Sequence, residues 1–177
     1  IGIGLTAGDA LTTGTDNIAI GRLAASATPD GADNIAIGRS AFAVSDGVAD
    51  CNIAIGLSAL GGADVSGLSN IAIGSLAMDA LTTGICNIAM GTNALGASTT
   101  GCNNIAIGEL ALGAGTLACG GAGQAEGNIA IGESALTVMT TGSNNIGIGL
   151  TSGDALTTGT DNIAIGRLSL SASTDGA

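Results

Sequence analysis

The sequence predicts an all-β fold, a parallel β-solenoid (β-roll) with coils of 17–18 residues. Three observations predict it: a five-residue segment recurs along the chain, apolar side chains alternate within it, and glycine ends almost every copy. The composition agrees, because Gly supplies 32 of the 177 residues and aromatic residues only 1%. A core without large side chains must be thin, so we expect a slim rod.

The recurring segment is Asn-Ile-Ala-Ile-Gly or a near copy, and a truncated copy opens the chain at Ile1. The copies begin at Asn17, Asn34, Asn52, Asn70, Asn87, Asn104, Asn128, Asn145 and Asn162. Successive Asn positions lie 17, 18, 18, 17, 17, 24, 17 and 17 residues apart. These intervals are too short for a helical hairpin or a propeller blade, so each one predicts a single solenoid turn.

Within each copy, the Ile-Ala-Ile alternation has the period of a β-strand. We expect both Ile side chains to line the inner face and Ala the outer face. An outer column of Ala, from Ala19 to Ala164, would then favour lateral packing against other chains. The Gly after the second Ile allows a corner, and a second Gly among Thr, Asp and Asn predicts another, as at Gly84 and Gly142. Each coil should therefore hold two strands and two corners.

The nine Asn residues should stack into a structural ladder. A side-chain amide carries two donors and an acceptor, so stacked Asn residues can bond along the column and to the corner backbone. This ladder would fix the register between coils. Replacing Asn87 by Leu should then destabilise a middle coil.

A longer repeat overlies the coils. Residues 1–32 match residues 146–177 at an offset of 145, with only five differences. We therefore expect residues 1–177 to form one continuous segment of a longer tandem array with a 145-residue super-repeat.

The repeat resembles the head repeats of trimeric autotransporter adhesins, whose coils contain a segment like Asn-Ser-Val-Ala-Ile-Gly. The matching residues include 33–38, Asp-Asn-Ile-Ala-Ile-Gly, and 69–74, Ser-Asn-Ile-Ala-Ile-Gly. The resemblance implies a left-handed β-roll, association of three chains, and attachment to host matrix or other cells. Similar repeats also resemble those of viral tail fibres.

Charge and chemistry exclude several classes of function. The 14 acidic residues against three Arg and no Lys disfavour nucleic acid as a partner. No apolar run approaches the roughly 18 residues of a membrane helix, so we expect no membrane insertion in this segment. With no His, Lys or Tyr, and with scattered carboxylates, we expect no enzyme activity and no cofactor. Turn carboxylates at 30–33 and 46–50 give only a weak indication of Ca²⁺.

Four cysteines leave a disulfide open. Cys51, Cys86 and Cys102 fall at the ends of repeats, and Cys119 lies in the 24-residue interval. Cys86 and Cys102 occupy adjacent coils and could join, and Cys102 with Cys119 is the competing pair. An extracellular fibre is a setting in which such bonds persist.

These features together predict a non-catalytic structural or adhesive filament, extracellular or on a cell surface. Its expected partners are copies of itself, with host matrix or a cell surface beyond them. The alternatives are a viral tail fibre shaft and an ice-binding solenoid. The ice-binding alternative rests on paired threonines at 12–13, 82–83, 99–100, 140–141 and 157–158.

Overall fold

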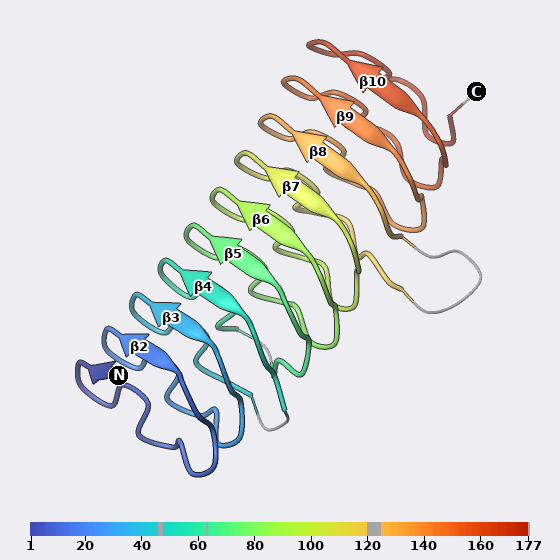
Figure 1. Ribbon diagram of the computed structural model, residues 1–177. Coiled ribbons are helices and arrows are strands. Elements are labelled where there is room, and N and C mark those ends of the chain that lie inside the picture. The colour runs from blue at the N-terminus through green and yellow to red at the C-terminus, as the bar shows by residue number, and fades with distance from the viewer. Residues whose placement is uncertain (46–47, 63, 120–124, 177) are drawn as a thin grey trace.

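The computed structural model describes residues 1–45, 48–62, 64–119 and 125–176, and it is all-β. Ten short strands follow one another along a rod (Figure 1). They are β1 (Gly2–Ile3), β2 (Ile18–Ile20), β3 (Ile35–Ile37), β4 (Ile53–Ile55), β5 (Ile71–Ile73), β6 (Ile88–Met90), β7 (Ile105–Ile107), β8 (Ile129–Ile131), β9 (Ile146–Ile148) and β10 (Ile163–Ile165).

All ten strands form one parallel sheet in sequence order. Each residue pairs with the same repeat position in the next coil, as Ala36 does with Ala54. From β7 to β8 the step is 24 residues, yet Ile105 still pairs with Ile129. The predicted parallel β-solenoid is therefore confirmed, including its register.

The second half of each coil differs from the prediction of a second strand. In the described residues it consists of turns, with three isolated bridges such as Ala27 with Val44. Residues of the left-handed region interrupt it, as at Ser40 (φ 54°) and Phe42 (φ 48°). A regular strand cannot contain such dihedral angles, so the chain returns through turns.

The predicted orientation of the strands is wrong. Ala19, Ala36 and Ala54 are fully buried, whereas the flanking Ile residues are partly exposed. Alternation places Ile and Ala on opposite faces without saying which face is inside. The buried Asn stands two positions before Ala and so shares its face, which turns Ile toward solvent.

The core between strand and turns is filled by one or two larger side chains per coil, and neighbouring sites compensate in size. Phe42 is followed three residues later by small Ser45, whereas Gly153 is followed by Leu156, and all four are buried. Such compensation keeps the thin core close-packed. Only Ala or Gly occupies the strand position opposite, where Gly147 already faces the Leu136 side chain, 2.8 Å from an added Cβ.

Glycine at the end of almost every strand is required by the coil stacking. At Gly21 the backbone adopts φ +127°, and an added Cβ would lie 2.6 Å from the carbonyl oxygen of Gly38 in the next coil. A side chain here would clash with backbone that cannot move independently. This corner therefore needs glycine for both its dihedral angle and its space.

Candidate interaction surface

The nine Asn residues that begin the repeats form the predicted ladder, here called the Asn column. The backbone N–H of Asn87 donates to Oδ1 of Asn70 at 3.0 Å, and Nδ2 of Asn87 donates to the same oxygen at 3.1 Å. That Nδ2 also donates to the carbonyl of Gly101 at 2.6 Å. The side chain of Asn87 is fully buried. The column thus satisfies the corner backbone inside the rod and is structural.

The outer face of the sheet carries two parallel columns of large aliphatic side chains, here called the Ile face. It consists of Ile18, Ile35, Ile53, Ile71, Ile88, Ile105, Ile129, Ile146 and Ile163 in one column and Ile20, Ile37, Ile55, Ile73, Met90, Ile107, Ile131, Ile148 and Ile165 in the other. Residues in the middle of the rod keep part of their surface in solvent, 40% for Met90 and 36% for Ile131. A continuous apolar stripe along a whole rod is unusual for a protein that stays alone in water.

Two corner columns border the Ile face. The strand-start column stands one residue before the Asn column and comprises Asp16, Asp33, Cys51, Ser69, Cys86, Asn103, Gly127, Asn144 and Asp161. The strand-end column follows the corner glycine and comprises Leu5, Arg22, Arg39, Leu57, Ser75, Thr92, Glu109, Glu133, Leu150 and Arg167. Most members of both columns are exposed. Except for Gly127, the strand-start residues at these positions that have φ values reported are non-glycine and left-handed, as Asp33 is at φ 57°.

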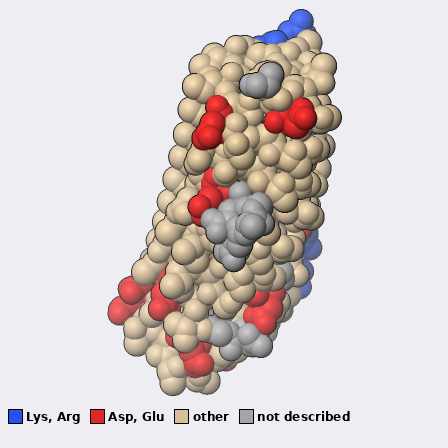
Figure 2. All heavy atoms as spheres, turned by 90° about the vertical axis from the view of Figure 1, so that its right-hand side faces the viewer, with Lys and Arg blue, Asp and Glu red and all other residues tan. Residues whose placement is uncertain are grey.

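The other acidic side chains lie apart from one another on the turn surfaces, and the arginines sit at the edge of the view in Figure 2. No group of three metal-ligating side chains occurs among the described residues. Asp30 accepts a hydrogen bond from the hydroxyl of Thr13 at 2.6 Å, and Asp50 accepts one from the N–H of Ala32 at 2.8 Å. These two carboxylates thus stabilise turns. Asp46, from the second suggested calcium segment, lies outside the described residues.

The disulfide joins Cys102 to Cys119, so the pairing of Cys86 with Cys102 is wrong. Cys102 and Cys119 are 17 residues apart, one coil, with their Cα atoms 5.7 Å apart. Cys86 belongs to the strand-start column and points to solvent, whereas Cys102 stands one position earlier in its repeat and is buried. Cys51 and Cys86 are both free and exposed.

The bonded Cys119 marks where the 24-residue interval leaves the regular coil. Thr100 bridges to Ala118 and Cys102 to Glu126, so the coil is complete on both sides of the extra residues. The N–H of Ala125 donates to the carbonyl of Ala118 at 2.7 Å and closes the base of the insertion. The extra residues therefore leave the solenoid register unchanged.

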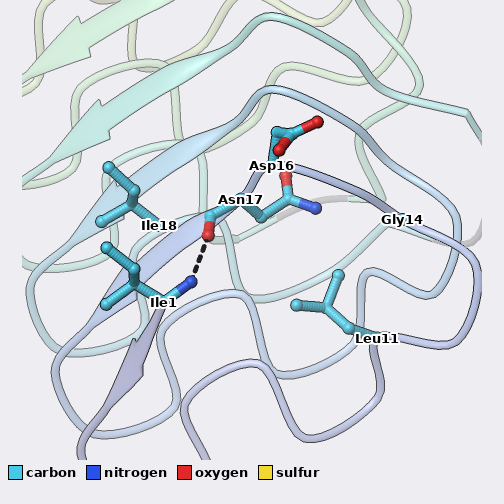
Figure 3. Close-up of a pocket in the computed structure, with 6 residues that line it drawn as sticks. All are labelled: Ile1, Leu11, Gly14, Asp16, Asn17 and Ile18. Atoms are coloured by element: carbon cyan, nitrogen blue, oxygen red, sulfur yellow. Dashed lines mark hydrogen bonds between the residues drawn. The ribbon is translucent and has the colours of Figure 1, made fainter.

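The hollows of the molecule lie at the two ends of the stack. Figure 3 shows the one at the first coil, where Leu11 and Ile18 lie beside the hydrogen bond from the Ile1 amino group to the carbonyl of Asn17. The second hollow is lined by 168 and 170–175 of the last coil. Both are open sides of a terminal coil, and neither brings together an acid, a base and a nucleophile.

The paired threonines lie in the turns of several coils, but their column is not uniform. Thr82, Thr140 and Thr157 each donate a hydroxyl proton to a carbonyl of the next coil at 3.0 Å. Pro29 and Asp30 occupy the corresponding place in the second coil. These hydroxyls thus contribute to the stacking of coils.

No helix long and apolar enough to cross a membrane occurs among the residues that the structure describes. Comparison with known proteins found no matching family model, no matching curated protein and no matching solved structure. The interpretation of this chain therefore depends on its own geometry.

Sequence reasoning missed the Ile face, although the sequence holds a signal for it. The ladder prediction already placed Asn inside, next to the corner backbone. Asn17 and Ala19 are two residues apart and must share a face, so Ile18 and Ile20 belong outside.

Proposed function

We propose that this chain is a non-catalytic structural or adhesive segment of an extracellular filament that assembles with copies of itself through the Ile face. The observation that carries the proposal is the Ile face, an apolar stripe as long as the sheet. It replaces the Ala column as the surface for lateral packing. The rod offers the length and rigidity that a filament needs.

The size of the Ile face supports an interface between copies. Nine steps between ten strands at about 4.8 Å give a length of about 43 Å. Five residue steps between the corners, at about 3.3 Å each, give a width of about 16 Å. The footprint is on the order of 700 Å² per copy, close to the ~800 Å² per partner of a stable interface.

The disulfide supports the extracellular part of the proposal. Cys102 and Cys119 are bonded, and such bonds persist mainly in oxidising compartments. The acidic surface, at a net charge of −11, disfavours nucleic acid as a partner. A tail fibre shaft would use the same coils and the same packing surface.

The proposal is tested by the mass of the purified protein in sedimentation velocity over a range of concentrations. The protein should form dimers or larger species, and the triple variant I55T/I73T/I107T should remain monomeric. Thr is β-branched and keeps the strand preference while removing apolar surface.

The control makes the same kind of change on exposed apolar residues elsewhere, in the variant V44T/V48T/L68T. These three side chains are 40%, 60% and 41% exposed. The control should associate like the unmodified protein. A monomeric unmodified protein at all concentrations, or equal association of the Ile-face variant, would refute the proposal.

A further inference from the structure

The charges of the two corner columns are correlated coil by coil. Each coil with Arg at the strand-end corner has Asp at its strand-start corner, as Arg39 has Asp33. The other such coils hold Asp16 with Arg22 and Asp161 with Arg167. The two coils with Glu at the strand-end corner, Glu109 and Glu133, have uncharged residues at the strand start.

These charges do not neutralise one another within the chain. Asp33 and Arg39 are six residues apart along an extended segment, about 20 Å, which is too far for an ion pair. Neither has an ion-pair partner in the part of the chain that the structure describes.

Neighbouring coils make the imbalance worse. Arg22 stacks beside Arg39, and Asp16 stacks beside Asp33, at the coil spacing of about 4.8 Å. Adjacent like charges across strands are destabilising. Each corner column therefore has a local excess of one sign that only an external partner can balance.

We propose that two copies pair through their Ile faces in parallel and in register, with the Asp of each strand-start corner facing the Arg of the same coil in the second copy. This inference rests on the proposed function and specifies its geometry. A two-fold axis parallel to the rod reverses the strand direction of the second copy, so each strand-start column lies beside a strand-end column at equal height.

The parallel arrangement balances every arginine of the corners. Asp16, Asp33 and Asp161 each face an Arg of the second copy, and symmetry doubles these pairs. Glu109 and Glu133 face Asn103 and Gly127, so no two charges of one sign meet.

An antiparallel arrangement is less complementary. It would place strand-start columns on each other, and it would match Arg with Glu at one register only. Asp16 and Asp33 would then face Gly127 and Asn103 without a counter-charge. The full length of the rod would no longer overlap.

The test uses two variants that reverse opposite corners. D16R/D33R makes both corners of two coils positive, and R22D/R39D makes them negative. Each variant alone should lose association by at least about tenfold in Kd, because four facing pairs become repulsive. An equimolar mixture should recover association, since only unlike copies then match.

The combined variant D16R/D33R/R22D/R39D should also associate like the unmodified protein in the parallel arrangement. In the antiparallel arrangement it would place Asp against Glu and stay dissociated. The control D9R/D175R adds the same charge on exposed residues away from the corners and should leave association unchanged.

Folding of the variants needs its own control, since Asp16 and Asp33 have left-handed backbones at φ 57°. The variant D16N/D33N keeps a residue type that tolerates this region. It should weaken association by a smaller factor and reduce its dependence on salt, because screening no longer acts on these pairs.

The two proposals fail in different ways. If the unmodified protein never associates, both fail together. If it associates and the Ile-face variant does not, while neither the mixture nor the combined variant recovers, the parallel pairing is wrong and the Ile-face interface stands.

Discussion

At the scale of single residues, the Asn column is the main source of register. Each buried amide connects three coils: Oδ1 of Asn87 accepts from the N–H of Asn104, and its Nδ2 donates to Asn70 and Gly101. An aliphatic side chain of similar size fills the same space but leaves these groups buried without partners. Buried groups without partners are more costly than an absent pair.

The variant Asn87→Leu should therefore lower the free energy of unfolding by about 3–5 kcal/mol, from two or three orphaned groups at about 1–3 kcal/mol each. Chemical denaturation followed by circular dichroism measures this change. The control Thr92→Leu places the same side chain on an exposed corner where Leu57 and Leu150 already occur. Equal midpoints for the two variants would contradict the structural role of the Asn column.

A second residue-scale prediction concerns Asp79, whose pKa is raised by burial, although the backbone N–H groups of Asp79 and Ala80 act in the opposite direction. A raised pKa means that the charged form destabilises the folded state. This penalty is present above the folded-state pKa and disappears as the pH falls below it.

Asp79→Asn should therefore raise the melting temperature slightly at pH 7, by less than about 1 kcal/mol because the group remains partly solvated. The difference should vanish as the pH falls toward the ordinary carboxyl range. The exposed Asp175→Asn controls for the change in net charge. A gap between Asp79→Asn and the control that widens on acidification would refute the burial effect.

At the scale of the coil, the corner after each strand sets the close approach of neighbouring turns. Gly74 adopts φ +137°, and an added Cβ would lie 2.5 Å from the carbonyl oxygen of Gly91. Gly166 occupies the same corner of the last coil at φ +115°, with nothing within 4 Å. This pair separates backbone strain from the clash with the next coil.

Gly74→Ala should destabilise the protein by about 3 kcal/mol or more, from strain of about 1–3 kcal/mol plus overpacking of similar size. Gly166→Ala should show the strain alone, about 1–3 kcal/mol at most. Thermal unfolding of the two variants gives the comparison. A loss at Gly166 as large as that at Gly74 would show that contact between coils is not the reason for glycine.

The coil also tolerates departures from its pattern when the stacking contacts are kept. The longer interval after Asn104 inserts its extra residues between Cys119 and Glu126, outside the sheet. Every neighbouring strand pair keeps its register across it. Insertions are tolerated at this side because the corner there is not part of the strand ladder.

At the scale of the whole molecule, the rod is a one-dimensional stack in which each coil contacts only its neighbours. All strand contacts join successive strands, from β1 with β2 to β9 with β10. Such a stack leaves one face of its sheet without cover along its full length. In a single copy the Ile face remains in water, which is why we place self-association at this surface.

The sequence by itself determined the coil length, the parallel register, the Asn ladder and the corner glycines. Each of these depends on contacts between identical positions one coil apart, and a repeat displays such contacts directly. Only the tertiary structure decided that Ala19 faces inward and Ile18 outward, and that Cys102 bonds to Cys119 and not to Cys86. These outcomes depend on the direction in which a side chain points from the coil, because a period-two pattern is the same whichever face is buried.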